Sequence, residues 1–201
     1  GDGELAETAT ALVPLPEVFS YWLQAGRVDV GFLGAAQIDR FGNLNTTVVG
    51  DYDAPKTRLP GAGGAPEIAR HAKQTFVVLK QTPRSFVADL DFVTTPGFLS
   101  GHGERGRRGL EGAGPQFVVS DLGLLRPDPQ TQELTLVALY PGVDAAQVAL
   151  ATGWPLAIAD EVETLAPPTD EELRVLRDLQ QRTRKAHSQR PPFPPNTAVK
   201  T

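Results

Sequence analysis

The sequence predicts an α/β protein with an open, mixed or mostly parallel sheet flanked by helices. Short apolar runs typical of buried strands recur along the chain. Stretches with the start and stop residues of short helices lie between them. The chain has 201 residues, of which 40% are hydrophobic, enough to bury a core. Such alternation of strands and helices is typical of a layered α/β fold.

The first expected helix covers residues 16–25, because Pro16 suits a first helical position and Gly26 suits the residue after a helix end. Further short helices are expected at 66–73 and 144–152. Apolar runs predict five strands, at residues 28–33, 76–80, 92–94, 117–120 and 134–139. The polar, proline-containing segment 126–133 is expected to connect two strands as a hairpin.

The C-terminal part contains a longer helix signal that begins after Pro168. Thr169 and Glu172 have the spacing of a capping box, in which each side chain binds the other residue's backbone amide. Acidic residues fill the first turn and basic residues the last, as the helix dipole favours. Leu173, Leu176 and Leu179 form a narrow apolar stripe. We expect residues 1–187 to form one domain that lacks its N-terminal part, and 188–201 to be an extended or disordered tail.

Composition narrows the classes of function. The net charge is −5, without a concentrated basic surface, so nucleic acid is not an expected partner. No apolar run is long enough to cross a membrane and no leader pattern is present, so a cytoplasmic protein is expected. With no cysteine and three scattered histidines, no metal site is expected. The chain also has no methionine, so the parent protein is expected to start earlier.

Residues 101–106, GHGERG, match the letters of a dinucleotide-binding motif. That motif requires a following helix, but three more glycines and a proline come next. We therefore interpret this stretch as a flexible glycine-rich loop. Its Arg105, Arg107 and Arg108 could contact an anionic ligand, although solvated side chains are the simpler interpretation. No G-x-S-x-G elbow is present, so a serine hydrolase is not indicated.

The segment GAGGAPEIA, residues 61–69, predicts a glycine-rich turn that enters a helix. Such a turn can present unpaired backbone amides to an oxyanion or a phosphate. A simple tight turn is the alternative, because glycine also serves wherever φ is positive.

Several ordered motifs carry a family resemblance over residues 1–179. They are FLGAAQIDRFGNLNTT, GDYDAPKTRLPGAGGAPEIA, FVTTPGFLSG and GAGPQFVVSDLGLLRPDPQTQELTLVALYPG. Together they resemble the β subunit of class I coenzyme A (CoA) transferases, most closely the glutaconate CoA-transferase type. The resemblance implies transfer of CoA between short dicarboxylic or 3-oxo acids through a glutamyl-CoA thioester. It also implies a partner α subunit, an acyl-CoA substrate and no tightly bound cofactor.

The resemblance also implies roles for the glycine-rich turn. Gly63 and Gly64 are expected to supply backbone donors to the oxyanion, with Gly61 and Ala65 beside CoA. It implies that Gln37, Asn43 and Asn45 line the same cleft, together with Asp39; alternatively, the two asparagines only close a turn. No glutamate of this chain lies in the family's nucleophile motif, so none is assigned.

Two alternatives remain beside transfer. A CoA-thioester hydrolase or decarboxylase could use the same scaffold, or the chain could be a non-catalytic partner subunit. The sequence does not identify the acid or the stoichiometry of the complex.

Overall fold

The computed structural model describes residues 8–188, which belong to two compact units. The larger one, residues 13–166, is called the sheet unit below. The smaller one has residues 8–12 and 167–188 in its described part and contains helix α6 (Asp170–Ser188). The predicted single domain stays a prediction, and the predicted tail lies outside the described residues from 189 onward.

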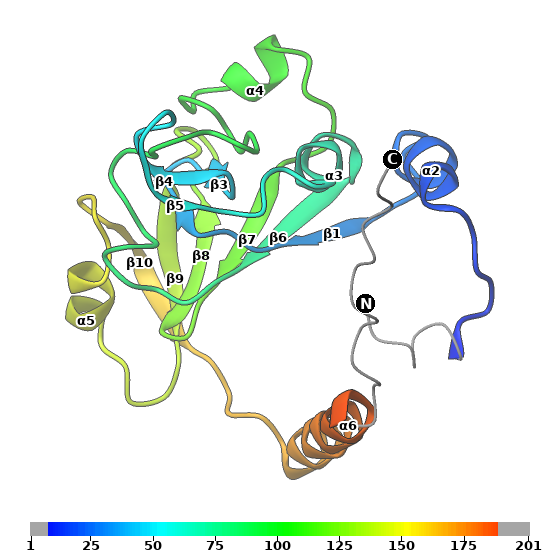
Figure 1. Ribbon diagram of the computed structural model, residues 1–201. Coiled ribbons are helices and arrows are strands. Elements are labelled where there is room, and N and C mark those ends of the chain that lie inside the picture. The colour runs from blue at the N-terminus through cyan, green and yellow to red at the C-terminus, as the bar shows by residue number, and fades with distance from the viewer. Residues whose placement is uncertain (1–7, 189–201) are drawn as a thin grey trace. The chain divides into compact units, whose positions relative to one another are not determined.

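Six strands form the central sheet, in the order β1-β6-β7-β8-β9-β10 (Figure 1). The pairs β1/β6, β6/β7 and β9/β10 are parallel, and β8 is antiparallel to both neighbours. The predicted open and mostly parallel sheet is therefore confirmed. The strands are β1 (Val30–Leu33), β6 (Gln74–Val78), β7 (Pro115–Val119), β8 (Gly123–Pro127), β9 (Leu134–Leu139) and β10 (Ala157–Thr164).

Two small antiparallel sheets and several short helices complete the sheet unit. The small sheets pair β2 (Gln37–Ile38) with β3 (Leu44–Asn45), and β4 (Val48–Gly50) with β5 (Pro55–Arg58). The helices are α2 (Leu15–Glu17), the π-helix η1 (Val18–Leu23), α3 (Ala65–His71), α4 (Glu104–Arg107) and α5 (Ala145–Leu150).

The core lies between the central sheet and the elements that cover one of its faces. Figure 1 shows α3 beside β1 and β6, on the side that also carries the small sheets. Along β9 every second residue is buried, which is the period of a strand with one covered face. The side chains of these strands pack with the small sheets and α3 in one cluster that includes Ile38, Leu44, Ala69, Phe86, Val118, Leu125, Leu134 and Trp154.

Most predicted elements are confirmed within a few residues. Helix 16–25 corresponds to α2 and η1, helix 66–73 to α3, and helix 144–152 to α5. The predicted 126–133 connection joins the antiparallel strands β8 and β9. The strand expected at 92–94 is wrong, because that segment contains only bends and irregular backbone. The expectation for 101–106 is corrected too, since residues 104–107 form the single turn α4.

Helix α6 begins with the predicted capping box. The Thr169 amide donates to the Glu172 carboxylate at 2.8 Å, and the Glu172 amide donates to the Thr169 hydroxyl at 3.2 Å. None of its residues is buried. Among residues 8–188, no helix combines the length and the apolar character needed to span a bilayer.

Candidate functional site

The glycine loop, residues 60–64, connects β5 to α3 (Figure 1). Gly61 and Gly63 have φ of +95° and +50°, a backbone conformation in which glycine is favoured. Gly64 has an ordinary φ, but a Cβ there would lie 2.5 Å from Cζ of Phe19. A local cause therefore favours glycine at each of the three positions. At Gly61 and Gly63 it is the backbone conformation, and at Gly64 it is close packing against η1.

The backbone amides of this loop fall into two groups. The Gly61 amide donates to the Thr46 carbonyl at 2.9 Å, and the Ala65 amide donates to the Ala62 carbonyl at 3.0 Å. The Ala62, Gly63 and Gly64 amides have no acceptor among the residues that the structure describes. Gly63 is also exposed. Three consecutive donors, of which two belong to Gly63 and Gly64, are thus without an acceptor, and the Gly61 and Ala65 amides are already used within the chain.

Three threonines hold the start of the loop, and sequence reasoning missed all of them. The Thr46 hydroxyl donates to the Gly61 carbonyl at 2.9 Å, and the Thr46 amide donates to the Thr94 hydroxyl at 2.9 Å. The Thr47 and Thr94 hydroxyls share a hydrogen bond of 2.7 Å. The Thr-Thr pair after Asn45 is visible in the sequence, but its partner Thr94 lies far along the chain.

Gln37 and Asn45 form a buried polar pair beneath the small sheets. The Asn45 amide group donates to Gln37 Oε1 and to the Val48 carbonyl, both at 2.6 Å. Gln37 Nε2 donates to the Asp91 carboxylate at 2.7 Å. Both side chains therefore form hydrogen bonds within the chain. Their predicted part in substrate binding stays a prediction.

Asn43 is 4% exposed and joins two segments. Its Nδ2 donates to Asp39 Oδ2 and to the Leu99 carbonyl, both at 2.8 Å. Its Oδ1 accepts from the Gly97 and Leu99 amides at 2.8 and 3.1 Å. The side chain therefore closes its own turn and also fixes the 97–99 segment. This geometry corresponds to the turn-closing alternative.

Asp39 sits at the centre of the same turn. Its Oδ1 accepts from the Phe41 and Asn43 amides at 2.9 and 3.0 Å. Burial raises the pKa of this carboxyl above its ordinary value, and the hydrogen bonds from Asn43 and Phe41 partly oppose that rise. Its oxygens are engaged in the turn, which argues for a structural carboxylate.

The arginines of the 101–106 motif and its continuation do not form a solvated cluster. Arg105 is 3% exposed and donates only to backbone carbonyls. Arg107 donates to the His102 carbonyl and Arg108 to the Glu104 carboxylate. The simpler interpretation of solvated side chains is therefore corrected for Arg105, because its guanidinium lies inside the fold.

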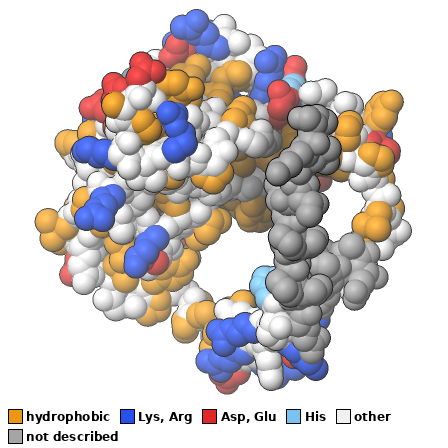
Figure 2. All heavy atoms as spheres, in the orientation of Figure 1, with side chains coloured by type: hydrophobic (Ala, Val, Ile, Leu, Met, Phe, Trp, Pro, Cys, Tyr) orange, Lys and Arg blue, Asp and Glu red, His pale blue; other side chains and the backbone are white. Residues whose placement is uncertain are grey.

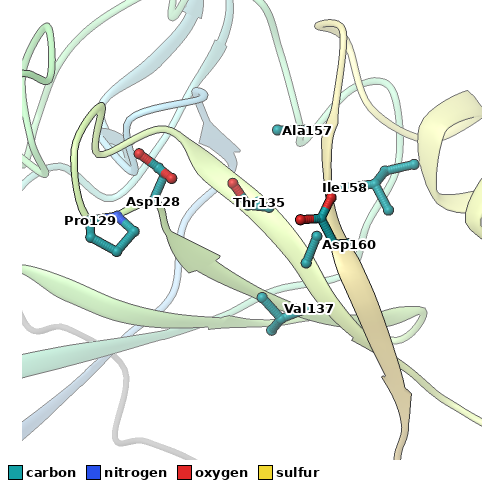
Figure 3. Close-up of a pocket in the computed structure, with 8 residues that line it drawn as sticks. Asp128, Pro129, Thr135, Val137, Ala157, Ile158 and Asp160 are labelled. Carbon is teal, nitrogen blue, oxygen red and sulfur yellow. The ribbon is translucent and has the colours of Figure 1, made fainter.

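A separate pocket lies between β9 and β10, away from the glycine loop in sequence (Figure 3). Asp128 and Asp160 are among its lining residues, beside Thr135 and Val137. The Asp128 carboxylate accepts from the Thr131 amide, the Thr131 hydroxyl and the Gln130 amide. The Thr131 hydrogen bonds, above all, lower the pKa of Asp128. This carboxylate stabilises the β8–β9 connection.

The face seen in Figure 2 carries no large basic patch on the sheet unit. Figure 2 shows lysine and arginine side chains of the sheet unit in separate small groups, with hydrophobic side chains between them. Among residues 8–188, no group of three or more metal-ligating side chains occurs. The glycine loop, with free amides at Ala62, Gly63 and Gly64, is an arrangement suited to hold an anionic oxygen.

Comparison with known proteins supports a family assignment. Residues 7–151 match the family model described as coenzyme A transferase. The B subunit of 3-oxoadipate CoA-transferase from Pseudomonas knackmussii is 53% identical over 189 residues, which cover 94% of this chain and 73% of that protein.

The B subunit of glutaconate CoA-transferase from Acidaminococcus fermentans is 42% identical over 152 residues, covering 75% of this chain and 56% of that protein. The crystal structure of that enzyme superimposes with a TM-score of 0.78 at 35% identity, covering 86% of this chain and 68% of that chain.

A more distant relative has another activity in its name. The cholesterol ring-cleaving hydrolase IpdB subunit of Rhodococcus jostii is 30% identical over 174 residues, covering 83% of this chain and 64% of that protein. The chain thus spans between about half and three quarters of the length of these relatives.

Proposed function

Since this chain belongs to the coenzyme A transferase family and is similar to its B subunits, we propose how it takes part in CoA transfer. It works with a second subunit to move CoA from an acyl-CoA to a carboxylic acid. The observation that carries the proposal is the pair of free, adjacent amides at Gly63 and Gly64.

The proposed chemistry passes through tetrahedral centres. A glutamate carboxylate attacks the thioester carbonyl, whose oxygen gains a negative charge as the new carbon–oxygen bond forms. The carbon–sulfur bond then breaks, which releases the CoA thiolate and leaves an acyl-glutamyl anhydride. The thiolate attacks the glutamyl carbonyl of this anhydride, which releases the donor carboxylate and leaves a glutamyl-CoA thioester. The amides of Gly63 and Gly64 donate to the thioester carbonyl oxygen as it gains charge, and each such donor commonly contributes about 100-fold or more in rate. No residue of this chain is proposed as the nucleophile.

The rest of the loop sets the position of these donors. The Gly61 amide and carbonyl are both bound to Thr46, which fixes the loop on the side of β3. On the other side the Ile68 amide donates to the Gly64 carbonyl at 3.0 Å. Gly61 and Ala65 therefore support the CoA site through the backbone rather than as free donors.

A six-carbon dicarboxylic 3-oxo acid is the proposed acid, with 3-oxoadipate as the specific candidate. The support is the 53% identity to a chain of 3-oxoadipate CoA-transferase over nearly the whole sequence. Glutaconate is the second candidate, at 42% identity over a shorter stretch. The hydrolase and decarboxylase alternatives are less favoured, because the hydrolase relative shares only 30% identity.

The partner is proposed to be the α subunit of such a transferase, because the similar proteins are the B subunits of their enzymes. We propose a cytoplasmic location, since acyl-CoA donors are metabolites of the cell interior. CoA enters as a substrate thioester and leaves on the acceptor acid.

Borohydride trapping tests the proposal. The full-length chain, in complex with its α subunit, is incubated with acyl-CoA and then with borohydride, which reduces an enzyme-bound glutamyl thioester. A transferase loses activity only when acyl-CoA was present first. Equal survival with and without acyl-CoA, together with release of free CoA, would identify a hydrolase and contradict the proposal.

A further inference from the structure

Arg105 has an unusual environment for a charged side chain. It lies in α4, is 3% exposed, and has no carboxylate partner within ion-pair distance among the described residues. Buried charges usually require a partner, because removing a charge from water is energetically unfavourable. Here the partners are backbone carbonyl dipoles.

The guanidinium has five N–H donors, and five carbonyls accept from them. The shortest contacts run from Nη2 to the Ala69 and Glu111 carbonyls, both at 2.6 Å, and from Nη1 to the Gly97 carbonyl at 2.9 Å. Nε donates to the Gly112 carbonyl at 3.2 Å, and Nη1 also reaches the Pro96 carbonyl at 3.5 Å. One side chain thus joins α3, the 96–97 segment and the 111–112 segment.

Two of these three segments support the glycine loop. Ala69 lies in α3, whose first turn holds the end of the loop through the Ile68 amide and the Gly64 carbonyl. The 96–97 segment follows Thr94, which holds Thr46 and, through it, Gly61. Arg105 therefore bridges the supports on both sides of the Gly63 and Gly64 amides.

The third segment closes around the same guanidinium. Gly112 has φ of +68° and packs so closely on the Ala72 carbonyl that a Cβ there would overlap it. A Cβ at Gly114 would lie 3.2 Å from Nε of Arg105. The Ala113 amide donates to the Lys73 carbonyl at 2.7 Å, which ties this segment to the residues that follow α3.

We propose that Arg105 is a positioning residue for CoA transfer, which fixes α3 relative to the 94–97 segment and so aims the Gly63 and Gly64 amides at the reacting thioester. This inference rests on the proposed function. Only a planar fork can bind carbonyls from three directions, whereas a lysine ammonium has three donors at a single point. The guanidinium itself touches no substrate.

The test compares Arg105→Lys with Arg108→Lys, a change of the same kind at an exposed position next to the same helix, where the side chain pairs with Glu104. Both variants are assayed for transfer in the complex with the α subunit. For Arg105→Lys we expect kcat to fall by about 10- to 100-fold, because small displacements of catalytic donors cost rate. The KM for acyl-CoA should change less than about threefold, since Arg105 does not contact the substrate and binding of the ground state is retained. Arg108→Lys should match the wild type.

Amide hydrogen exchange supplies a readout that is independent of activity. In Arg105→Lys the peptide covering residues 59–68 should exchange faster, while a peptide from β9 should not change. If kcat and local exchange both stay at wild-type values, the inference is wrong. If exchange rises throughout the sheet unit and kcat falls with general loss of folding, Arg105 is a stability residue only, which also overturns it.

The outcomes separate this inference from the proposed function. If the wild-type complex transfers no CoA, the proposed function fails, and exchange in residues 59–68 alone decides whether Arg105 holds the loop. If the wild type transfers CoA and Arg105→Lys does so equally well, only the inference about Arg105 fails.

Discussion

At the scale of single residues, the Asn43 side chain joins its own turn to the 97–99 segment through four hydrogen bonds. Replacing it by alanine leaves the buried Gly97 amide and its neighbours without partners. An unpaired buried polar group costs about 1–3 kcal/mol, so we expect Asn43→Ala to lower the free energy of unfolding by about 2–4 kcal/mol. Urea denaturation followed by circular dichroism measures this loss.

Gln130→Ala is the matched control for that change. Gln130 is exposed, and its contact with the Asp128 carboxylate comes from its backbone amide, which alanine retains. Its truncation should change the free energy of unfolding by less than about 0.5 kcal/mol. If both variants lose the same free energy of unfolding, the hydrogen bonds of the Asn43 side chain do not stabilise the fold more than an exposed side chain does.

Asp39 predicts a specific pH dependence. Burial raises its pKa in the folded protein above the ordinary value of 3.8, so the folded state holds its proton more tightly than the unfolded state. The contribution of Asp39 to the free energy of unfolding is therefore largest below about pH 3.8. It decreases as the pH rises through the pKa of Asp39 in the folded protein. The difference between wild type and Asp39→Asn should fall across that window. A difference that rises or stays constant would contradict the raised pKa.

The glycine loop shows which residue-level features a sequence can reveal. A run of glycines predicts a turn with sparse side chains, and the structure has that turn. Why glycine is needed at each position is not predictable from the sequence. At Gly61 and Gly63 the cause is a positive φ. At Gly64 the cause is contact with Phe19, a residue far away in the chain. The burial of Arg105 is hidden for the same reason, since its five acceptors come from segments that only folding brings together.

At the scale of elements, strands with one strict periodicity are the easiest to predict. The strand predicted at residues 134–139 is β9, with these bounds and alternate burial. The 28–33 run is typical of a buried strand, yet Phe32 of β1 is 68% exposed. Its ring packs edge-to-face on Phe76, which in turn packs on Phe117. Apolar content alone does not tell which face is covered.

Strand β10 and the 92–94 segment show the opposite failures. The sequence does not predict β10, because its eight residues include three acidic ones, a composition that edge strands tolerate. Residues 92–94 have the composition of a strand, but Phe92 stacks on Tyr52 and Thr94 binds Thr46 and Thr47. Tertiary contacts therefore override a short local preference.

Helix α5 provides a prediction at this scale. In its capping box the Gln147 amide donates to the Asp144 carboxylate at 2.8 Å, and the Asp144 amide donates to Gln147 Oε1 at 2.9 Å. Asp144→Ala should lower the free energy of unfolding by about 1 kcal/mol, while Asp144→Asn should retain most of the cap. Thermal unfolding of the two variants compares them. If Asp144→Ala and Asp144→Asn have the same free energy of unfolding, the side-chain cap does not contribute to stability.

At the scale of the whole molecule, the family and its general chemistry follow from long ordered motifs, and the comparisons confirm the family. The details of the site do not follow in the same way. Gln37, Asn43 and Asn45 lie in the small sheets and the turn between them, but their polar atoms bind the chain's own loops. A motif identifies a fold because it preserves such packing, and it does not by itself distinguish packing from contact with substrate.

In the intact enzyme, the proposed stabilisation of the oxyanion depends on the Gly63 and Gly64 amides. Replacing either residue by glycolic acid exchanges the backbone N–H for an ester oxygen and adds no side chain. The most direct test is the steady-state transfer rate of these ester variants in complex with the α subunit. We expect kcat to fall by about 100-fold with little change in KM for acyl-CoA. A kcat within about twofold of wild type for both variants would contradict the account.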